Sequence, residues 1–425
     1  MTAEPIDTSL VASLRGLDRD GRWLFALRTI RMFGYGFLAV VLVLYLAGSG
    51  LDPIAIGAVL TLTLVGDTIV SLWLTTHADR LGRRRVLIAS SLLVVIAGLV
   101  FSITNLLPLL ILAGIVGVIS PTGNEVGPFL AIEQASLTQV VPARRRTATF
   151  AWYNLAGYVA TATGALLAGL LSQVLISSGW PEVDAYRAVV VVYAAIGLVM
   201  AVLATRLSPD IEVPASEARP EDDGIARRLG LGRSRSVVLR LSALFSLDAF
   251  AGGFIPQSLM AYWFALHFGV SPATLGAIFF AANLLAAVSS LSAARIAARI
   301  GLIETMVFTH LPSNVLLILV PLMPTLPLAV LMLLLRFTLS QMDVPTRQSY
   351  VMAVVQPDER SAAAGVTGIA RTVGAAISPS FSSVLVATAA TAALPFFLAG
   401  GLKIVYDVLI YRDFRKVRPE EEAAR

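Results

Sequence analysis

Long apolar stretches follow one another along almost the whole chain, with short polar segments between them. A helix that crosses a bilayer needs ~20 predominantly apolar residues. By this criterion the pattern predicts twelve helical spans, over 23–47, 53–75, 86–104, 108–133, 147–177, 186–206, 237–266, 272–295, 304–323, 327–355, 361–388 and 393–411. We therefore expect an all-α polytopic membrane protein.

One long polar stretch, rich in Pro, Glu, Asp and Arg, separates the first six spans from the last six. We expect five parts: an N-terminal segment 1–22, a six-helix bundle 23–206, a linker 207–236, a second six-helix bundle 237–411 and a tail 412–425. The bundles repeat each other at an offset of 219 residues, with three matches: Pro53 to Gly57 with Pro272 to Gly276, Arg80 to Gly82 with Arg299 to Gly301, and Pro108 with Pro327. The repeat predicts two bundles of the same fold.

Composition agrees with the pattern. The chain has 425 residues, of which 57% are hydrophobic and 14% charged, and its mean hydropathy is +0.80, which excludes an ordinary soluble domain. The sequence has no cysteine, so disulfides and thiolate metal sites are excluded, and its three histidines are scattered. We expect no metal and no cofactor.

The charges in the loops predict the orientation of the chain. Loops that carry many arginines stay in the cytoplasm. Arginines gather at 80–85, at 144–146, in the linker and in the tail, whereas the alternate loops are neutral or acidic. Both termini should therefore be cytoplasmic, as expected for a multi-pass protein of the cell inner membrane. The net charge of +5 reflects these loops, so we expect no nucleic-acid partner, but contact of residues 144–146 with lipid headgroups.

The loop after the second span has the sequence His77-Ala-Asp-Arg-Leu-Gly-Arg-Arg-Arg85. It resembles the loop motif of the major facilitator superfamily, with Thr75 in place of the motif's first glycine. The matching residues are Asp79, Arg80, Gly82, Arg83 and Arg84. The resemblance, with the repeat, implies two six-helix bundles around a central cavity, alternating access by rocking of one bundle on the other, a small-molecule substrate, and a monomer that is not an enzyme.

In this family the loop motif controls conformational switching, which implies a gating role for its five matching residues. Glu133 stands where the family places an acidic partner, so we expect an ion pair with Arg83 or Arg84. By the same resemblance Asp79 should meet the N-terminus of helix 11, where exposed amides favour an anion. Asp67, deep in helix 2, has two open hypotheses, gating and substrate binding.

Charged residues inside the apolar spans are functional candidates, because burying a charge in a membrane is costly unless it is paired or hydrated. In the family, helices 1, 4, 7 and 10 line the central cavity. The resemblance therefore implies a substrate-binding or proton-binding set of Arg31, Glu125, Asp248, Arg336, Asp343 and Arg347.

Glu125 lies in the sequence Ser120-Pro-Thr-Gly-Asn-Glu-Val-Gly-Pro128, which should break or kink helix 4 near the middle of the membrane. Unpaired carbonyls and a carboxylate in a wet cavity can bind a substrate or a proton. The alternative is that Glu125 only forms an ion pair with an arginine of the other bundle.

Helix 10 also leaves two hypotheses open. Asp343 and Arg347 lie four residues apart on one helix face, with Arg336 two turns earlier, and they form either a local salt bridge or an anion-binding stripe. We expect Arg31 and Asp248 to pair across the bundles as an inner gate, or Arg31 to extend to the membrane surface, as Arg28 should. Lys403 and Asp407 should form a structural pair in helix 12.

The first functional hypothesis is proton-coupled export of a drug-like or amphipathic metabolite, with Glu125 and Asp343 as proton carriers. Helix 5, however, lacks the proline that drug exporters of the family carry there. The alternative is proton-coupled uptake or exchange of an organic anion bound by Arg336, Arg347 and Arg31. A membrane sensor or enzyme would need a soluble domain or a nucleophile–base set, and the sequence shows neither.

Overall fold

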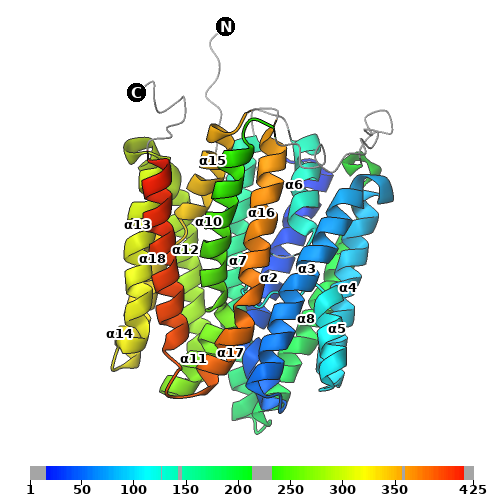
Figure 1. Cartoon of the computed structure of the whole chain (residues 1–425). Helices are drawn as coiled ribbons and strands as arrows, with labels where there is room; N and C mark the ends of the chain where they lie inside the picture. The colour runs from blue at the N-terminus through cyan, green and yellow to red at the C-terminus, as the bar shows by residue number, and fades with distance from the viewer. Residues whose placement is uncertain (1–15, 126, 142–145, 213–231, 357–358, 416–425) are drawn as a thin grey trace.

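The structure, a computed structural model, describes residues 16–125, 127–141, 146–212, 232–356 and 359–415. These residues form helices and loops without any β-strand. The helices run alternately up and down through the molecule, and the first helix begins at the same end at which the last one finishes (Figure 1). We call this the terminal end and the opposite one the far end.

Residues before 213 make up what we call the N half. Its helices are α2 (Arg19–Gly48), α3 (Pro53–Leu81), α4 (Arg83–Ile103), α5 (Leu107–Val116), α6 (Phe129–Val140), α7 (Arg146–Ser177), α8 (Glu182–Ala204) and the 3₁₀ helix η2 (Pro209–Ile211). The fourth crossing consists of two pieces, α5 and α6, as Figure 1 shows. The predicted break in helix 4 is thus confirmed, although α6 continues to Val140 where the sequence suggested an end at 133.

Residues from 232 onward make up the C half. Its helices are α10 (Arg235–Gly253), α11 (Gln257–Phe268), α12 (Pro272–Ile300), α13 (Leu302–Leu319), η4 (Val320–Leu322), α14 (Leu326–Leu339), α15 (Asp343–Val354), α16 (Arg360–Ile377), α17 (Pro379–Ala387) and α18 (Leu394–Phe414). Three crossings of this half are interrupted, between α10 and α11, between α14 and α15, and between α16 and α17.

Within the described ranges, 11 helical segments are long and apolar enough to cross a membrane, and the pair α5–α6 supplies the remaining crossing. Large apolar side chains such as Ile69, Ile96, Leu198 and Val288 are exposed on these helices. Such a surface suits lipid and not water. The predicted all-α membrane fold is confirmed. The predicted boundaries of the linker and the tail stay predictions, and Arg144 and Arg145 lie outside the described residues.

The internal repeat is present in the backbone. Helices α3 and α12 both begin at a proline that follows a capping side chain, and both end at a glycine, at the predicted offset of 219 residues. The two glycines, Gly82 and Gly301, have φ angles of 93° and 98°. Only glycine adopts such angles easily, so the sharp turn into the next helix is built in the same way in both halves.

The halves contact each other mainly where α7 packs on α12, where α3 packs on α16 and α17, and where α2 packs on α11. The backbone N–H and the hydroxyl of Ser380 donate to the Thr61 hydroxyl at 3.1 Å and 2.6 Å. The Ser258 N–H donates to the Pro121 carbonyl at 3.1 Å. Thr61 lies in the part of α3 near the far end, so the halves are hydrogen-bonded together toward that end of the molecule.

Candidate functional site

A cluster of charged side chains lies inside the N half, which we call the N cluster. It consists of Arg28 and Arg31 of α2, Glu125 of the helix break, Glu133 of α6 and Tyr153 of α7. Arg31 and Glu133 have fully buried side chains. Arg31 donates to Glu125 Oε1 at 2.5 Å and to Glu133 Oε2 at 2.9 Å, so one guanidinium bridges both carboxylates.

Arg28 completes the cluster. Its Nη1 donates to Glu125 Oε2 at 2.8 Å, and its Nε donates to the Tyr153 carbonyl at 3.0 Å. The expectation that Arg28 extends to the membrane surface is therefore wrong, since α2 begins early enough to place this residue ~13 Å inside the helix. The Tyr153 hydroxyl donates to Glu133. Two cations thus face two carboxylates.

The helix break holds Glu125 in place. Gly123 and Gly127 have φ angles of 69° and 81°, which let the chain turn out of the helix and back. The Gly127 N–H donates to Asp67 Oδ1 at 2.7 Å, and Asp67 also accepts from the Ser71 hydroxyl at 3.1 Å. Asp67 therefore anchors the unwound segment to α3. No lysine, arginine or histidine of the described chain forms an ion pair with it.

A second cluster, which we call the C cluster, surrounds Asp248 of α10. Asp248 accepts from Lys403 Nζ at 2.5 Å, Arg371 Nη1 at 3.3 Å and Arg347 Nη1 at 3.4 Å. Arg347 also donates to Asp343 Oδ2 at 2.6 Å, which is the local salt bridge considered from the sequence. The cluster thus joins helices α10, α15, α16 and α18.

His310 of α13 and Asp407 of α18 complete the C cluster. His310 Nδ1 lies 2.8 Å from Asp407 Oδ1, and its Nε2 lies 3.8 Å from Asp248 Oδ1. Asp407 also accepts from Asn314 Nδ2 at 2.9 Å. The predicted pair of Lys403 and Asp407 is therefore wrong, because each meets a closer partner on a neighbouring helix. The sequence reading missed His310 and Arg371 altogether.

Arg336 of α14 differs from the other buried arginines. Its residue exposure is 9%, its Nε has no hydrogen-bond partner, and no carboxylate of the described chain forms an ion pair with it. Its guanidinium carbon lies 5.1 Å from the centre of the Phe337 ring, a weak cation–π contact. Arg336 is thus a buried cation that has no carboxylate in direct contact within the described parts of the chain.

The predicted gate between Arg31 and Asp248 is not formed in this structure, since each is bound within its own half. Tyr158 of α7 lies close to Ser290 of α12, at the contact between the halves. In each cluster one member keeps contact with solvent, Glu125 with 18% of its side chain exposed and Arg371 with 33%.

The motif loop has other partners than predicted. Asp79 accepts from Arg83 Nε at 2.8 Å, and the backbone N–H groups of Arg83 and Arg84 donate to Glu212 at 2.6 Å and 3.1 Å. Glu133 pairs with Arg31 instead of Arg83 or Arg84. Residues 357–358, just before α16, lie outside the described residues, so the contact of Asp79 with helix 11 stays a prediction. Arg80 is exposed.

At the start of the C half a second carboxylate binds backbone N–H groups, as Glu212 does at the motif loop; we call this contact a cap. Glu359 accepts from the backbone N–H groups of Gly232, Arg233 and Ser234 at 2.5 Å, 2.9 Å and 2.9 Å. Hydrogen bonding by the side chain and backbone of Ser234, followed by the other two amides, lowers the pKa of the Glu359 carboxyl. This carboxylate ties the beginning of α10 to the beginning of α16.

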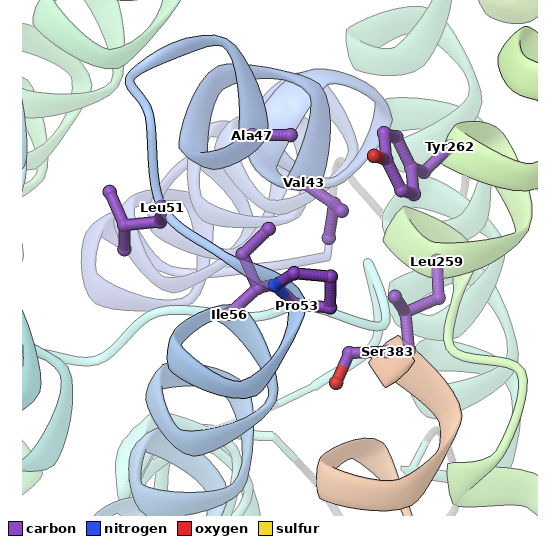
Figure 2. A pocket seen from close by; sticks show the side chains of 8 residues that line it. All are labelled: Val43, Ala47, Leu51, Pro53, Ile56, Leu259, Tyr262 and Ser383. Atoms are coloured by element: carbon purple, nitrogen blue, oxygen red, sulfur yellow. The ribbon is translucent and has the colours of Figure 1, made fainter. Parts of the chain in front are cut away.

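A small cavity of about 120 Å³ lies between the halves near the far end (Figure 2). It is lined by Val43, Ala47, Leu51, Pro53, Ile56, Leu259, Tyr262 and Ser383. Drug-sized ligands need ~300–1,000 Å³, and Val43 lies ~18 Å along α2 from Arg31. This cavity is therefore too small for such a ligand and remote from the charged clusters.

No group of three or more His, Cys, Asp or Glu residues in the described chain could hold a metal ion. What the arrangement can do chemically is bind charge: the clusters offer guanidinium and ammonium donors to an anion, and carboxylates and one imidazole to a proton.

Comparison with known proteins gave consistent matches. The sequence model of the Major Facilitator Superfamily matches residues 24–379 and 243–425. The chain is 30% identical over 418 residues to the uncharacterized membrane protein YJR124C of Saccharomyces cerevisiae, covering 92% of this chain and 93% of that one.

Two of the similar solved structures illustrate the shared fold. One is a bacterial homolog of the human lysosomal transporter Spinster in an inward-facing, unoccupied conformation, with a TM-score of 0.70, 16% identity, and coverage of 94% of this chain and 97% of that one. The other is the nucleoside transporter NupG, with a TM-score of 0.71, 14% identity, and coverage of 94% and 100%. At these identities the likeness concerns the fold alone.

Proposed function

The chain belongs to the Major Facilitator Superfamily, and on that premise we propose that it carries a small organic anion across the membrane together with protons. It is a multi-pass membrane transporter of small solutes and not an enzyme. Transporters of this family bind small-molecule substrates and are typically monomers.

The observation that carries the proposal is the charge balance of the C half. Four cations lie at membrane depth, Arg336, Arg347, Arg371 and Lys403, against the three carboxylates Asp248, Asp343 and Asp407. An uncompensated charge in this setting costs several kcal/mol. A bound anion would supply the missing negative charge, and a guanidinium matches the geometry of a carboxylate or phosphate.

Export of a drug-like or amphipathic metabolite, with Glu125 and Asp343 as proton carriers, is the second candidate. Such compounds are often cationic and need an available negative charge. Glu125 already holds Arg28 and Arg31, and Asp343 already holds Arg347. The geometry therefore supports an anionic substrate better than a cationic one.

Alternating access requires parts that switch, and we assign the gating role to the motif residues Asp79, Arg80, Gly82, Arg83 and Arg84, with Glu133 and Asp67 holding helix 4. We place the terminal end in the cytoplasm of a cell with the protein in its inner membrane. The hydrogen bonds that join the halves toward the far end support a state closed to the outside.

A thermal-shift experiment on purified full-length protein tests the substrate class. A panel of organic mono- and dianions and a matched panel of organic cations are added at two pH values. A ligand present at 100 times its Kd stabilises the fold by ~2.7 kcal/mol, so binding by the wild type gives a measurable shift.

Arg336→Gln should weaken anion binding by ~10–150-fold, because a hydrogen bond to a charged group contributes ~1.5–3 kcal/mol. Arg295→Gln is the matched control, since Arg295 is exposed on α12. Stabilisation by cations alone, unaffected by Arg336→Gln, would refute the anion proposal and favour export of a cationic compound.

A further inference from the structure

His310 is buried at membrane depth, ~12 Å along α13 from its start at the terminal end. Its two ring nitrogens face carboxylates on two different helices, Asp407 of α18 at 2.8 Å and Asp248 of α10 at 3.8 Å. Histidine is the side chain whose unperturbed charge change falls between pH 5 and 8. We propose that His310, held by Asp407, takes up and releases the coupling proton, an assignment that rests on the proposed proton-coupled transport.

The ring geometry prepares a place for this proton. A neutral imidazole carries one N–H. Nδ1 lies near Asp407 Oδ1 and also 3.2 Å from Asn314 Nδ2, and we assign the N–H to Nδ1, where the Asp407 carboxylate accepts it. The Nε2 of the neutral ring then directs its lone pair toward the Asp248 carboxylate, which has no hydrogen to donate to it. In the protonated ring both nitrogens carry hydrogen, and each faces a carboxylate.

Protonation would have the opposite effect on the ion pairs of Glu125 and Asp343, the two carboxylates that the sequence suggested as proton carriers. Glu125 and Asp343 are each bound to arginine, so a proton on either one breaks an existing ion pair. Protonation of His310 creates an ion pair instead. The C cluster is therefore better arranged to exchange a proton without losing its packing.

The surrounding charges link the proton to the anion. The helices of the C half contribute these inward charged or titratable groups: Lys403, Tyr406 and Asp407 of α18, Asp248 of α10, Asp343 and Arg347 of α15, Arg336 of α14 and Arg371 of α16. Arg295 and Arg299 of α12, which packs on α13, are exposed. Four of the inward groups are cations, and they oppose a further positive charge on His310.

An anion bound at Arg336 removes part of this opposition. The anion therefore favours protonation of His310, and the proton favours binding of the anion, because coupling between two ligands is reciprocal. Cotransport of an anion and a proton follows from this arrangement without direct contact between the two.

The three histidines of the sequence allow a direct measurement on the unmodified protein. Purified full-length protein with isotope-labelled histidine should give three imidazole signals by NMR, assigned with single variants of His77, His267 and His310. We expect the His310 signal to change with pH as the ring gains or loses its second proton, and Asp407→Asn to alter that change. A His310 signal that stays in one protonation state at every pH at which the protein is folded overturns the proposal.

A second measurement tests the link to conformation. The sequence has no cysteine, so Ser178→Cys and Thr325→Cys, exposed at the far end on opposite halves, can carry a pair of fluorescent labels that report the distance between the halves. One coupled proton changes the ratio of the two conformations by up to tenfold per pH unit. We expect such a shift in the wild type and its loss in His310→Gln.

The control is His267→Gln, since His267 is exposed at the end of α11. A wild type without a pH-dependent shift, or a shift that survives His310→Gln, overturns the assignment. If the shift depends on His310 but no organic anion stabilises the protein, the proposed substrate class fails and the proton site stands. If anions bind through Arg336 and the pH-dependent shift survives in His310→Gln, the proton site fails and the proposed substrate class stands.

Discussion

Replacing Glu133 by glutamine should destabilise the protein strongly. Its side chain is fully buried and accepts hydrogen bonds from Arg31 and Tyr153. Glutamine keeps the size of the side chain and removes its charge, which leaves two buried cations of the N cluster against one carboxylate. Breaking a buried ion pair from one side costs ~3–5 kcal/mol. Because Arg31 keeps Glu125 at 2.5 Å, we expect a loss near the lower end, about 3 kcal/mol.

Two comparisons sharpen this prediction. Glu125→Gln should cost less than Glu133→Gln, since Glu125 retains 18% exposure and water can reach the arginines it leaves behind. Asp184→Asn is the surface control: Asp184 and Arg187 form an ion pair whose side chains are 37% and 39% exposed. A pair of this kind contributes ~0–1 kcal/mol.

The assay is thermal and denaturant unfolding of the purified protein in detergent, applied to a double-mutant cycle of Glu133→Gln and Arg31→Met. Once one partner is removed, removal of the other relieves an unpaired buried charge. The double variant should therefore be more stable than the sum of the single losses implies, by ~1–3 kcal/mol. Additive losses, or a Glu133→Gln loss no larger than that of Asp184→Asn, would show that Glu133 does not balance Arg31 in the folded protein.

Three further predictions concern the loops and termini. Asp79→Asn should slow transport while leaving equilibrium binding of the solute nearly unchanged, because the motif loop lies between two spans; a flux assay beside a binding assay separates the two effects. A reporter that fluoresces only in the cytoplasm, fused after residue 425, should be bright, and a well-expressed dark fusion would reverse the topology. The pKa of Glu359 is lowered in the folded protein by its hydrogen bonds to Ser234, Gly232 and Arg233, so its contribution to stability is present above the pKa of an unfolded glutamate and is lost as pH falls through the folded pKa. Glu359→Gln should therefore flatten the acid side of a stability-against-pH curve, and an unchanged acid limb would count against this cap.

The backbone was largely predictable from the sequence. Apolar length gave the spans, and the two prolines and two glycines between 120 and 128 gave the break in helix 4. The repeat of prolines and glycines gave the equivalence of α3 with α12. These features depend on local chemistry, which a sequence states directly.

The partners of the charged residues were not predictable, because they depend on helix depth and rotation. The family resemblance and an end of helix 4 at residue 133 together predict that Glu133 pairs with the motif loop. In the structure α6 continues to Val140, which places Glu133 ~10 Å deeper and beside Arg31. Helix rotation likewise brings Lys403 of α18 next to Asp248 of α10 and not next to Asp407, although the spacing of four residues suited a pair within one helix.

The repeat keeps the backbone and changes the charges. In the N half the first helix carries the arginines, and the fourth crossing carries the glutamates that balance them. In the C half the first helix, α10, carries Asp248, while Arg336 and Arg347 lie on the fourth crossing. The two cations and two carboxylates of the N cluster balance each other, whereas the four cations counted at membrane depth in the C half outnumber the three carboxylates there by one. On the proposed function, the anion and its proton are therefore held mainly by the C half, and the N half can rock over them without breaking its own ion pairs. This division explains why Glu133→Gln should affect stability first, whereas Arg336→Gln should affect binding first.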